Sequence, residues 1–365
     1  MKPFIILIGD NNISNYTLIK FLRKNGFDFD EVVVVYTKKT IDNKNYLKKL
    51  VKQEFIEINV EDKKEKFLEV KQEILDKLNE LKNIEKIFLD FTGGLKSMSL
   101  GAYLAIDEYE LDESNKYISY VVFDFDKKES KVFFKRGEEY KLDESLSIEE
   151  IAGVHGIFEL DYKTSNSDFF SVESVLWLLD KIQNEEKEFF EDLWDKKFKE
   201  LKDLKWKESL KDYLFKIENL SNNQLKYLQK YIKSDFLEEY IFYMLNEIKD
   251  EVGISEIAWN VRKGKEAKFE VDVIASKDNN LYLFSCTTDK SKNIVKQKGF
   301  EAKEKATQLG GKNGTMILVS CIDENWKQEL LEDLEEKKGG NPPKIIVFED
   351  LIDYNKLKQK LKEIF

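Results

Sequence analysis

The sequence is poor in the residues that most often build disulfides, zinc sites and catalytic triads. Only two of its 365 residues are cysteines, Cys286 and Cys321, so a disulfide framework is not expected. It has a single histidine, His155, which almost excludes Ser-His-Asp triads elsewhere in the chain and histidine-rich zinc sites. We expect His155 to lie at the end of a short helix without a catalytic role.

Long apolar runs are also missing. No stretch approaches the length of a membrane span, and the first residues lack the apolar region and cleavage site of a signal peptide, so we expect a cytoplasmic protein. The length of 365 residues is enough for two or three domains with cores, and a hydrophobic content of 42% indicates a globular chain. Because the net charge is −11, any contact with nucleic acid must use a local basic patch.

Strands and helices are predicted to alternate through residues 1–135, which we assign to one domain. Continuous Val and Ile runs, such as residues 32–35, are typical of parallel strands covered on both faces. The pattern predicts a doubly wound α/β sheet, with a closing hairpin around Lys127 and Lys128. The expected strands are 4–8, 32–36, 55–60, 84–89, 117–124 and 131–135, and the expected helices are 14–25, 41–52, 63–81 and 96–106.

The turn at residues 92–97 is the clearest candidate for a ligand site in this domain. Gly93 and Gly94 let the backbone approach a ligand, and the first free N–H groups of the following helix favour an anion. Lys96 adds a positive charge. From the residues alone, a tight turn with an exposed lysine explains the pattern equally well. Ligands of such sheets bind beyond the carboxyl ends of the strands, so the turns after the first and second strands are expected at the same edge.

One segment of this domain resembles a known family. Thr92-Gly93-Gly94-Leu95-Lys96-Ser97-Met98-Ser99 resembles the T-G-G-x-K-x-M-S turn of the CARF domain of type III CRISPR defence, although Leu95 stands where Thr is common. Gly9-Asp10-Asn11 resembles the family's first-strand loop. The resemblance implies a homodimer that binds a cyclic oligoadenylate, most simply cyclic tetra-adenylate, across its two-fold axis. The candidate ligand-binding residues are Gly9, Asp10, Asn11, Asn12, Thr37, Thr92, Gly93, Gly94, Lys96, Ser97 and Met98.

Residues 136–235 are predicted to form a connector followed by a helical spacer. Ser147 and Glu150 have the spacing of a capping box at the start of a short helix. Residues 171–235 are expected to be mostly helical. Their three tryptophans are expected in a core and not in a ligand stack, and they are Trp177, Trp194 and Trp206.

Residues 236–365 are predicted to form a second α/β domain. The expected order of a helix, three strands and then alternating helices and strands resembles the PD-(D/E)xK core of restriction-endonuclease-like nucleases. The expected helices are 236–249, 293–309, 324–337 and 350–365, and the expected strands are 254–262, 268–275, 281–286, 315–320 and 344–348.

Two carboxylates are predicted on one face of the second of these strands. Alternation along a strand places Glu270 and Asp272 on the same side. Burying both costs desolvation energy unless a cation compensates, and Mg²⁺ or Mn²⁺ suits oxygen ligands without histidine. The alternative is an edge strand whose charges face solvent.

The next strand departs from the nuclease pattern. We place Cys286 and Thr288 where the family has Glu and Lys. Either Lys290 or Lys292 folds back from the loop to supply the lysine, or the carboxylate and the lysine have moved to the next helix. On that helix Lys298 and Glu301 share a face. The alternative for Lys298 and Glu301 is an ordinary surface ion pair. Residues 301–311 resemble the corresponding helix of CARF-fused restriction-like nucleases, and residues 237–240 resemble their opening helix. The resemblance implies Asp272, Glu270, Glu239 and Glu301 as metal ligands and Asp272, Glu270, Glu301 and Lys298 as catalytic residues.

The predicted function is therefore a cyclic oligoadenylate-activated, metal-dependent nuclease that hydrolyses phosphodiester bonds of DNA, RNA or both. Two alternatives stay open on the sequence. One is a signal-gated binding protein with a degenerate nuclease fold. The other is a ring nuclease that degrades the cyclic oligoadenylate in its own CARF site.

Overall fold

The computed structural model describes residues 1–124, 129–167, 170–183, 231, 235–263, 269–335 and 341–365. It divides into two compact units, Met1–Phe158 and Glu159–Phe365. Residues 136–158, which we expected in a connector, pack within the first unit. The hairpin at Lys127 and Lys128 and most of the helical spacer, with Trp194 and Trp206, lie outside the described residues.

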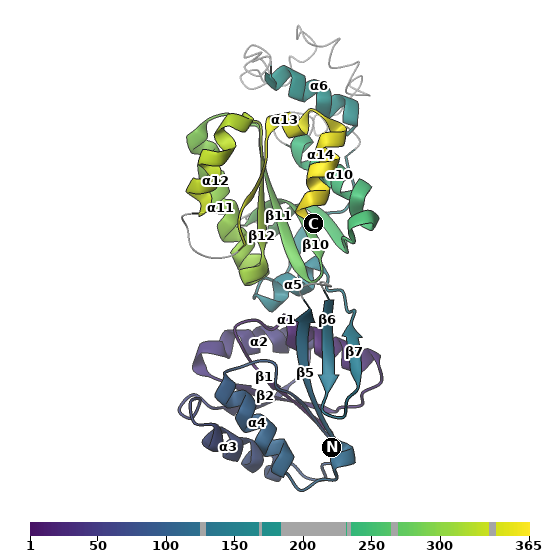
Figure 1. Cartoon of the computed structure of the whole chain (residues 1–365), viewed down its shortest axis with the longest axis vertical. Coiled ribbons are helices and arrows are strands. Elements are labelled where there is room, and N and C mark those ends of the chain that lie inside the picture. Colours follow the sequence, from purple (N-terminus) through teal and green to yellow (C-terminus); the bar gives the residue numbers. More distant parts are fainter. Residues whose placement is uncertain (125–128, 168–169, 184–230, 232–234, 264–268, 336–340) are drawn as a thin grey trace. The chain divides into compact units, whose positions relative to one another are not determined.

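The first unit is a seven-stranded sheet in the order β3-β2-β1-β4-β5-β6-β7. The strands β1 to β5 run parallel to one another, whereas β6 and β7 are added antiparallel at one edge. Helices α1 and α2 cover one face of the sheet, and α3 and α4 cover the other (Figure 1). The predicted doubly wound, Rossmann-like α/β sheet is thereby confirmed. The elements are β1 (Pro3–Leu7), α1 (Ile13–Lys24), β2 (Glu31–Tyr36), α2 (Ile41–Val51), β3 (Phe55–Asn59), α3 (Phe67–Glu80), β4 (Ile87–Asp90), α4 (Lys96–Glu108), β5 (Lys116–Asp124), β6 (Glu129–Phe134), β7 (Glu139–Leu142) and α5 (Ile148–Val154).

The parallel strands form because their side chains are buried on both faces. The Val32 to Val35 run of β2 is fully buried, and every residue of β1 is buried. Alternate residues of β1 and β2 pack against α3 and α4 in one cluster that also contains Met98. This packing fixes the register of the strands and, with it, the position of the turns that follow them.

The predicted capping box at the start of α5 is confirmed. The Glu150 amide donates to the Ser147 hydroxyl at 3.1 Å, and the Ser147 amide donates to a Glu150 carboxylate oxygen at 2.9 Å. The same carboxylate accepts hydrogen bonds from Tyr16 and Lys20 of α1, which joins α5 to α1. His155 is the C-cap residue of α5, as expected.

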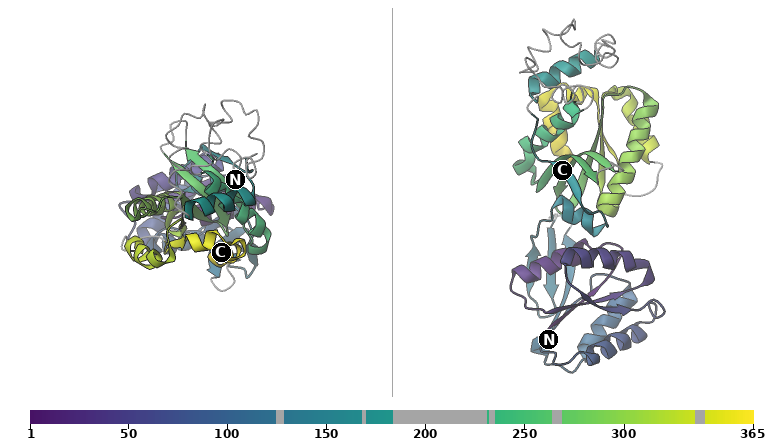
Figure 2. Two further views of the ribbon diagram at one scale, coloured as in Figure 1. Left: turned by 90° about the horizontal axis from the view of Figure 1, so that it is seen from above. Right: turned by 180° about the vertical axis from the view of Figure 1, so that it is seen from behind.

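The second unit is a six-stranded sheet in the order β13-β12-β11-β10-β9-β8. Strands β11, β12 and β13 run parallel, and β8 to β11 pair antiparallel. Helices α11 and α12 lie on one face, and α10 and α14 lie on the other, as Figures 1 and 2 show. The order of elements from α10 onward is the predicted one. The elements are β8 (Leu160–Lys163), α6 (Val172–Gln183), α10 (Phe236–Val252), β9 (Glu256–Lys263), β10 (Glu270–Lys277), β11 (Asn280–Thr287), α11 (Lys292–Gly310), β12 (Thr315–Ser320), α12 (Lys327–Glu335), β13 (Lys344–Ile346), α13 (Phe348–Leu351) and α14 (Tyr354–Ile364).

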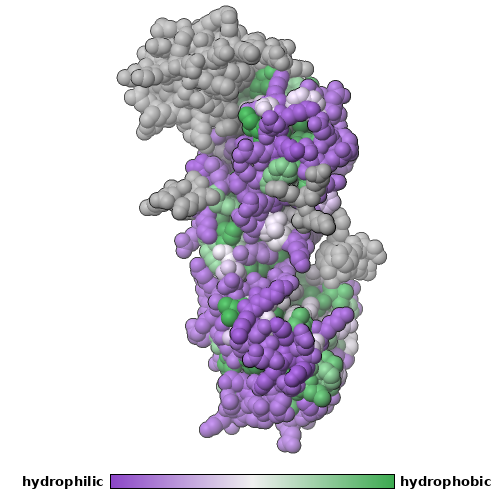
Figure 3. Space-filling model, turned by 90° about the vertical axis from the view of Figure 1, so that its left-hand side faces the viewer, coloured by the Kyte–Doolittle hydropathy of each residue, from purple (hydrophilic) through white to green (hydrophobic). Residues whose placement is uncertain are grey.

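The surface drawn in Figure 3 is mostly hydrophilic, and its apolar side chains form small, separate groups. Among the helices of the described residues, none has both the length and the apolar character needed to cross a membrane. Cys286 and Cys321 are buried free thiols. Trp177 is buried in the core of the second unit, as predicted for a structural tryptophan.

Candidate functional site

The turns after β1 and β4 meet at the switch point of the first sheet. Strand β1 pairs with β2 on one side and with β4 on the other, so the order of strands reverses between β1 and β4. In doubly wound sheets this is the place where ligands bind, beyond the carboxyl ends of the strands. Gly9 and Gly94 are in close contact there, because a Cβ atom on Gly9 would lie 3.2 Å from the Gly94 amide nitrogen. The two predicted turns therefore form one site.

Two glycines shape this corner. A Cβ atom on Gly93 would lie 2.1 Å from the carbonyl oxygen of Leu7, so any side chain at this position would clash with that oxygen. Gly94 has φ +75°, in the left-handed region that favours glycine. We refer to the residues from 92 to 96, together with Gly9, as the glycine corner.

Lys96 is the first residue of α4 and is exposed. It makes no hydrogen bond or ion pair with any residue in the part of the chain that the structure describes. The N-cap residue Leu95 contributes no side-chain cap, so the N–H groups of the first turn stay available. A helix N-terminus with a neighbouring ammonium group is suited to an anion such as phosphate.

Asp90 lies beneath the surface at the glycine corner and is hydrogen-bonded to Thr92. This fully buried carboxylate accepts hydrogen bonds from the Thr92 amide and hydroxyl, both at 3.0 Å, and from Ser119. Burial raises the pKa of Asp90 to about 6, although these hydrogen bonds oppose the rise. The Thr92 hydroxyl also accepts from the Val121 amide at 2.7 Å, so Thr92 links β4 to β5.

Three further candidate residues reach the surface beside the corner. Asp10 is exposed and lies 3.4 Å from the Lys39 ammonium group. Asn11 is exposed, and its side chain accepts from the Ile13 amide at 2.9 Å, so it satisfies an N–H group at the start of α1. The Ser97 hydroxyl donates to the carbonyl of Lys64.

The remaining candidates lie beneath the surface. Asn12 is buried and donates to the carbonyl of Asn43 at 2.8 Å. Thr37 is buried in a capping box with Thr40. Met98 belongs to the core, with its side chain directly below Gly94. These three residues support the corner from inside.

In the second unit, Asp272 lies on the face of β10 that α11 covers. The register pairs Val273 with Phe284, so Ser285 lies across from Asp272, and the Ser285 hydroxyl is 3.4 Å from its carboxylate. Cys286 points to the opposite face, into the core. The assignment of Cys286 and Thr288 to the Glu and Lys positions was therefore wrong by one residue, because a slip of one position along a strand reverses the face.

Two lysines of α11 flank the Asp272 carboxylate. The Lys298 ammonium donates to the carbonyl oxygen of Cys286 at 3.2 Å, and the Lys305 ammonium donates to that of Glu270 at 2.6 Å. Asp272 accepts from the Cys286 amide at 2.6 Å. Burial raises the pKa of Asp272, while Lys298, the Cys286 amide and Lys305 oppose the rise.

The predicted metal ligands do not converge. Glu270 is paired with Arg262 at 2.6 Å, and the fully buried Glu239 accepts from the amide and hydroxyl of Ser167, both at 2.8 Å. Glu301 is exposed and accepts from Gln297. Within the described ranges no group of three or more Asp, Glu, His or Cys residues could hold a metal ion. The carboxylates therefore do not fit the metal cage that the sequence led us to expect.

Two residues of this region were missed. Lys305 lies seven residues after Lys298, on the same face of α11, so its spacing could have identified it. Glu238, and not Glu239, is the α10 carboxylate whose charge reaches Cys286. Together with Asp272 and burial, it raises the pKa of the Cys286 thiol. Glu238 and Glu239 are neighbours in the sequence. Which of them acts on Cys286 depends on how α10 is rotated against the sheet, and no sequence pattern indicates that rotation.

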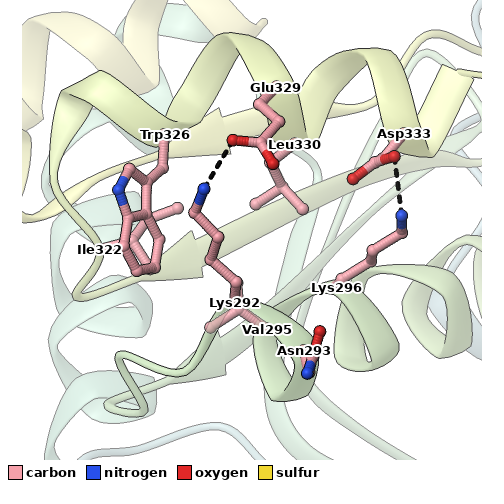
Figure 4. Close-up of a pocket in the computed structure, with 9 residues that line it drawn as sticks. All are labelled: Lys292, Asn293, Val295, Lys296, Ile322, Trp326, Glu329, Leu330 and Asp333. Atoms are coloured by element: carbon pink, nitrogen blue, oxygen red, sulfur yellow. Dashed lines mark hydrogen bonds and ion pairs between the residues drawn. The ribbon is translucent and has the colours of Figure 1, made fainter.

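A cavity of about 130 Å³ lies between the start of α11 and α12 (Figure 4). Lys292 pairs with Glu329, and Lys296 pairs with Asp333, across its opening. The Lys292 ammonium lies 4.5 Å from the centre of the Trp326 ring. The four charged side chains that line the cavity are therefore paired with one another.

Comparison with known proteins identifies the first unit. Residues 4–151 match the family model of the Card1 CARF domain, which confirms the resemblance predicted from the glycine turn. No curated protein matches the chain.

Solved structures with a similar fold include the following three. Can2 from Sulfobacillus thermosulfidooxidans in complex with cyclic tetra-adenylate superposes with a TM-score of 0.64 at 14% identity, covering 100% of this chain and 99% of that one. Protein VC1899 from Vibrio cholerae gives a TM-score of 0.67 at 15% identity, covering 100% and 98%. A type III CRISPR defence DNA nuclease activated by cyclic oligoadenylate gives 0.52 at 13% identity, covering 94% of this chain and 47% of that one.

Proposed function

Starting from a first unit whose residues 4–151 match the Card1 CARF domain, we propose that this chain is a CRISPR effector gated by a cyclic oligoadenylate. The first unit binds the cyclic nucleotide, and the second unit then acts on the phosphodiester backbone of nucleic acid as a nuclease. The observation that carries the proposal is the glycine corner at the switch point, with the exposed Lys96 beside an uncapped helix N-terminus.

The glycine corner is suited to a phosphate group of the ring. Gly93 and Gly94 bring the backbone to the surface, the first turn of α4 offers N–H donors, and Lys96 offers an ammonium group. Asp10 and Asn11 are exposed beside the corner, where they can contact a ribose or base edge. The Can2 structure of the same fold contains cyclic tetra-adenylate, so this ring is the ligand that we propose.

We further propose that two copies of the chain share one ring. A cyclic oligoadenylate repeats the same phosphate around its circumference, and a two-fold dimer presents two copies of one anion site. Each copy would contribute its own glycine corner and Lys96. Binding can change the activity of the second unit only if the ring binds the active arrangement more tightly than the inactive one.

For the second unit, the Asp272 region is the proposed place of action. The likeness in fold to a DNA nuclease activated by cyclic oligoadenylate supports a nuclease role. The described carboxylates offer no set for a divalent ion, so no step of hydrolysis is assigned to one. The roles proposed here for this chain's own residues are a carboxylate at Asp272 and positive charge at Lys298.

A cleavage assay tests this function. The full chain is incubated with plasmid, single-stranded DNA and RNA, with and without cyclic tetra-adenylate, and in Mg²⁺, Mn²⁺ or EDTA. Cleavage that requires the cyclic nucleotide and disappears in Asp272→Ala supports the proposal. Failure of cyclic tetra-adenylate and the other ring sizes to bind the chain contradicts it.

A second candidate function is favoured by one specific observation. Ser285 stands opposite Asp272, and neither it nor the next residue on that face, Thr287, carries a charge. A chain that has lost both the carboxylate and the lysine of this strand fits a signal-gated nucleic-acid binder. Ring-dependent binding of an oligonucleotide without cleavage in any metal would identify this function.

A further inference from the structure

We infer that the second unit binds a phosphodiester group through Lys298 and Lys305, and that this binding needs no divalent cation. The inference deepens the proposed function and depends on it only for nucleic acid as the source of the phosphate. It rests on the arrangement of α11 against β10 and β11.

The two lysines are fixed on either side of one carboxylate. Lys298, Ala302 and Lys305 lie on the face of α11 that meets the sheet. The ammonium of Lys298 is anchored on the carbonyl of Cys286, and that of Lys305 is anchored on the carbonyl of Glu270. An ammonium group has three donors, so each lysine retains donors after this backbone hydrogen bond.

Two ammonium groups, those of Lys298 and Lys305, act on the Asp272 carboxylate. Lys298 and Lys305 contribute two charges, and Asp272 contributes one of opposite sign. Glu270 is already balanced by Arg262, directly across from it on β9. In this chain the two lysines provide the compensation for Asp272 that we had expected from a metal ion. A divalent cation would be repelled by both ammonium groups, whereas a phosphate anion would be attracted to them.

The shape of the hollow favours a polymer over an enclosed small molecule. It measures about 10 Å³ and is bordered by Glu270, Asp272, Ser285, Ala302 and Lys305, among others, whereas Lys298 is not one of its lining residues. That volume accepts about one water-sized atom, which is enough for one non-bridging phosphate oxygen. A nucleotide cannot be enclosed there, so the ligand is a phosphate presented at the surface by a longer chain. The Ser285 hydroxyl, which donates to the Asp272 carboxylate at 3.4 Å, also borders the hollow.

The test uses fluorescence anisotropy of a labelled single-stranded oligonucleotide, DNA or RNA, added to the full chain with and without cyclic tetra-adenylate. Each titration is made in EDTA and again in Mg²⁺. Lys298→Gln and Lys305→Gln should each weaken binding about tenfold, the loss of one charge-assisted hydrogen bond. Lys303→Gln is the matched control, because Lys303 lies on the same helix but donates to the carbonyl of Leu334.

We expect equal affinity in EDTA and Mg²⁺, rescue by Lys305→Arg, and competition by inorganic phosphate at high concentration. The inference is overturned if the wild-type chain binds no oligonucleotide in either condition, if binding appears only with Mg²⁺, or if all three glutamine variants bind alike. Binding of cyclic tetra-adenylate is measured on the same variants. If the wild-type chain does not bind cyclic tetra-adenylate, the proposed function is contradicted, but the lysine site is not.

Discussion

The carbonyl oxygen of Leu7 lies 2.1 Å from the position that a Cβ atom on Gly93 would occupy. This contact joins the end of β1 to the turn after β4, so it sets the shape of the glycine corner. Both partners are backbone atoms, which cannot rotate away as a side chain can. The corner therefore depends on glycine at this position for steric reasons, whatever its ligand.

We predict that Gly93→Ala destabilises the first unit by about 3 kcal/mol, because β1 and the turn must separate. All five tryptophans lie after residue 170, so their fluorescence does not report on this unit. Hydrogen exchange of peptides from β1 and β4 measures the effect, with peptides of the second unit as an internal reference. Gly310→Ala is the control, since its Cβ would meet only ordinary contacts at 3.4 Å. Equal exchange in both variants would contradict the steric argument.

Lys96 gives a second prediction. Lys96→Gln should weaken binding of cyclic tetra-adenylate about 10–100-fold, the loss of a charge-assisted contact to phosphate, and should leave thermal stability unchanged. Isothermal titration calorimetry measures the affinity. Lys77→Gln is the matched control, because Lys77 is on α3 and pairs with Glu80. An unchanged affinity for Lys96→Gln would remove the glycine corner as the ring site.

Much of the fold was predictable because the strong signals are local. Continuous Val runs identified the parallel strands, and Gly93 and Gly94 identified the turn between a strand and a helix. The sequence could not reveal β7 (Glu139–Leu142) and β8 (Leu160–Lys163), which each hold one buried residue among four. Short edge strands of this kind have no apolar alternation to detect.

The candidate site in the second unit was less predictable because it depends on long-range contacts. A single-residue error in the alignment of β11 exchanged Ser285 for Cys286 and with it the face of the sheet. Glu270, a predicted metal ligand, is paired with Arg262 instead. This pairing depends on the register of β9 against β10. Such partners are set by the fold and not by neighbouring sequence.

Asp90 predicts a pH dependence of stability. Burial raises its pKa in the folded chain to about 6, above the ordinary value of 3.8. A folded-state pKa above the unfolded value means that its stabilising contribution is complete below pH 3.8 and is lost as pH rises through about 6. The difference corresponds to at most about 3 kcal/mol.

The measurement is urea unfolding, followed by circular dichroism, of wild type and Asp90→Asn between pH 4 and pH 7. The asparagine cannot ionise, so its free energy of unfolding relative to wild type should rise with pH over this window. Only the slope is compared, because the substituted amide also alters the hydrogen bonds of Thr92 and Ser119. A constant difference between the two proteins would show that Asp90 keeps an ordinary pKa.

Asp272→Asn should separate cleavage from binding. The asparagine can still accept the hydrogen bond from the Cys286 amide, but the negative charge between Lys298 and Lys305 is gone. If hydrolysis uses this carboxylate, ring-dependent cleavage falls to background. The oligonucleotide should meanwhile bind as tightly as before or up to about tenfold more tightly, because a phosphate no longer meets a carboxylate there. Asp278→Asn is the control, since Asp278 lies in the exposed turn between β10 and β11. Weaker oligonucleotide binding by Asp272→Asn, with folding intact by circular dichroism, would mean that the carboxylate itself attracts the ligand, as it would through a bound cation.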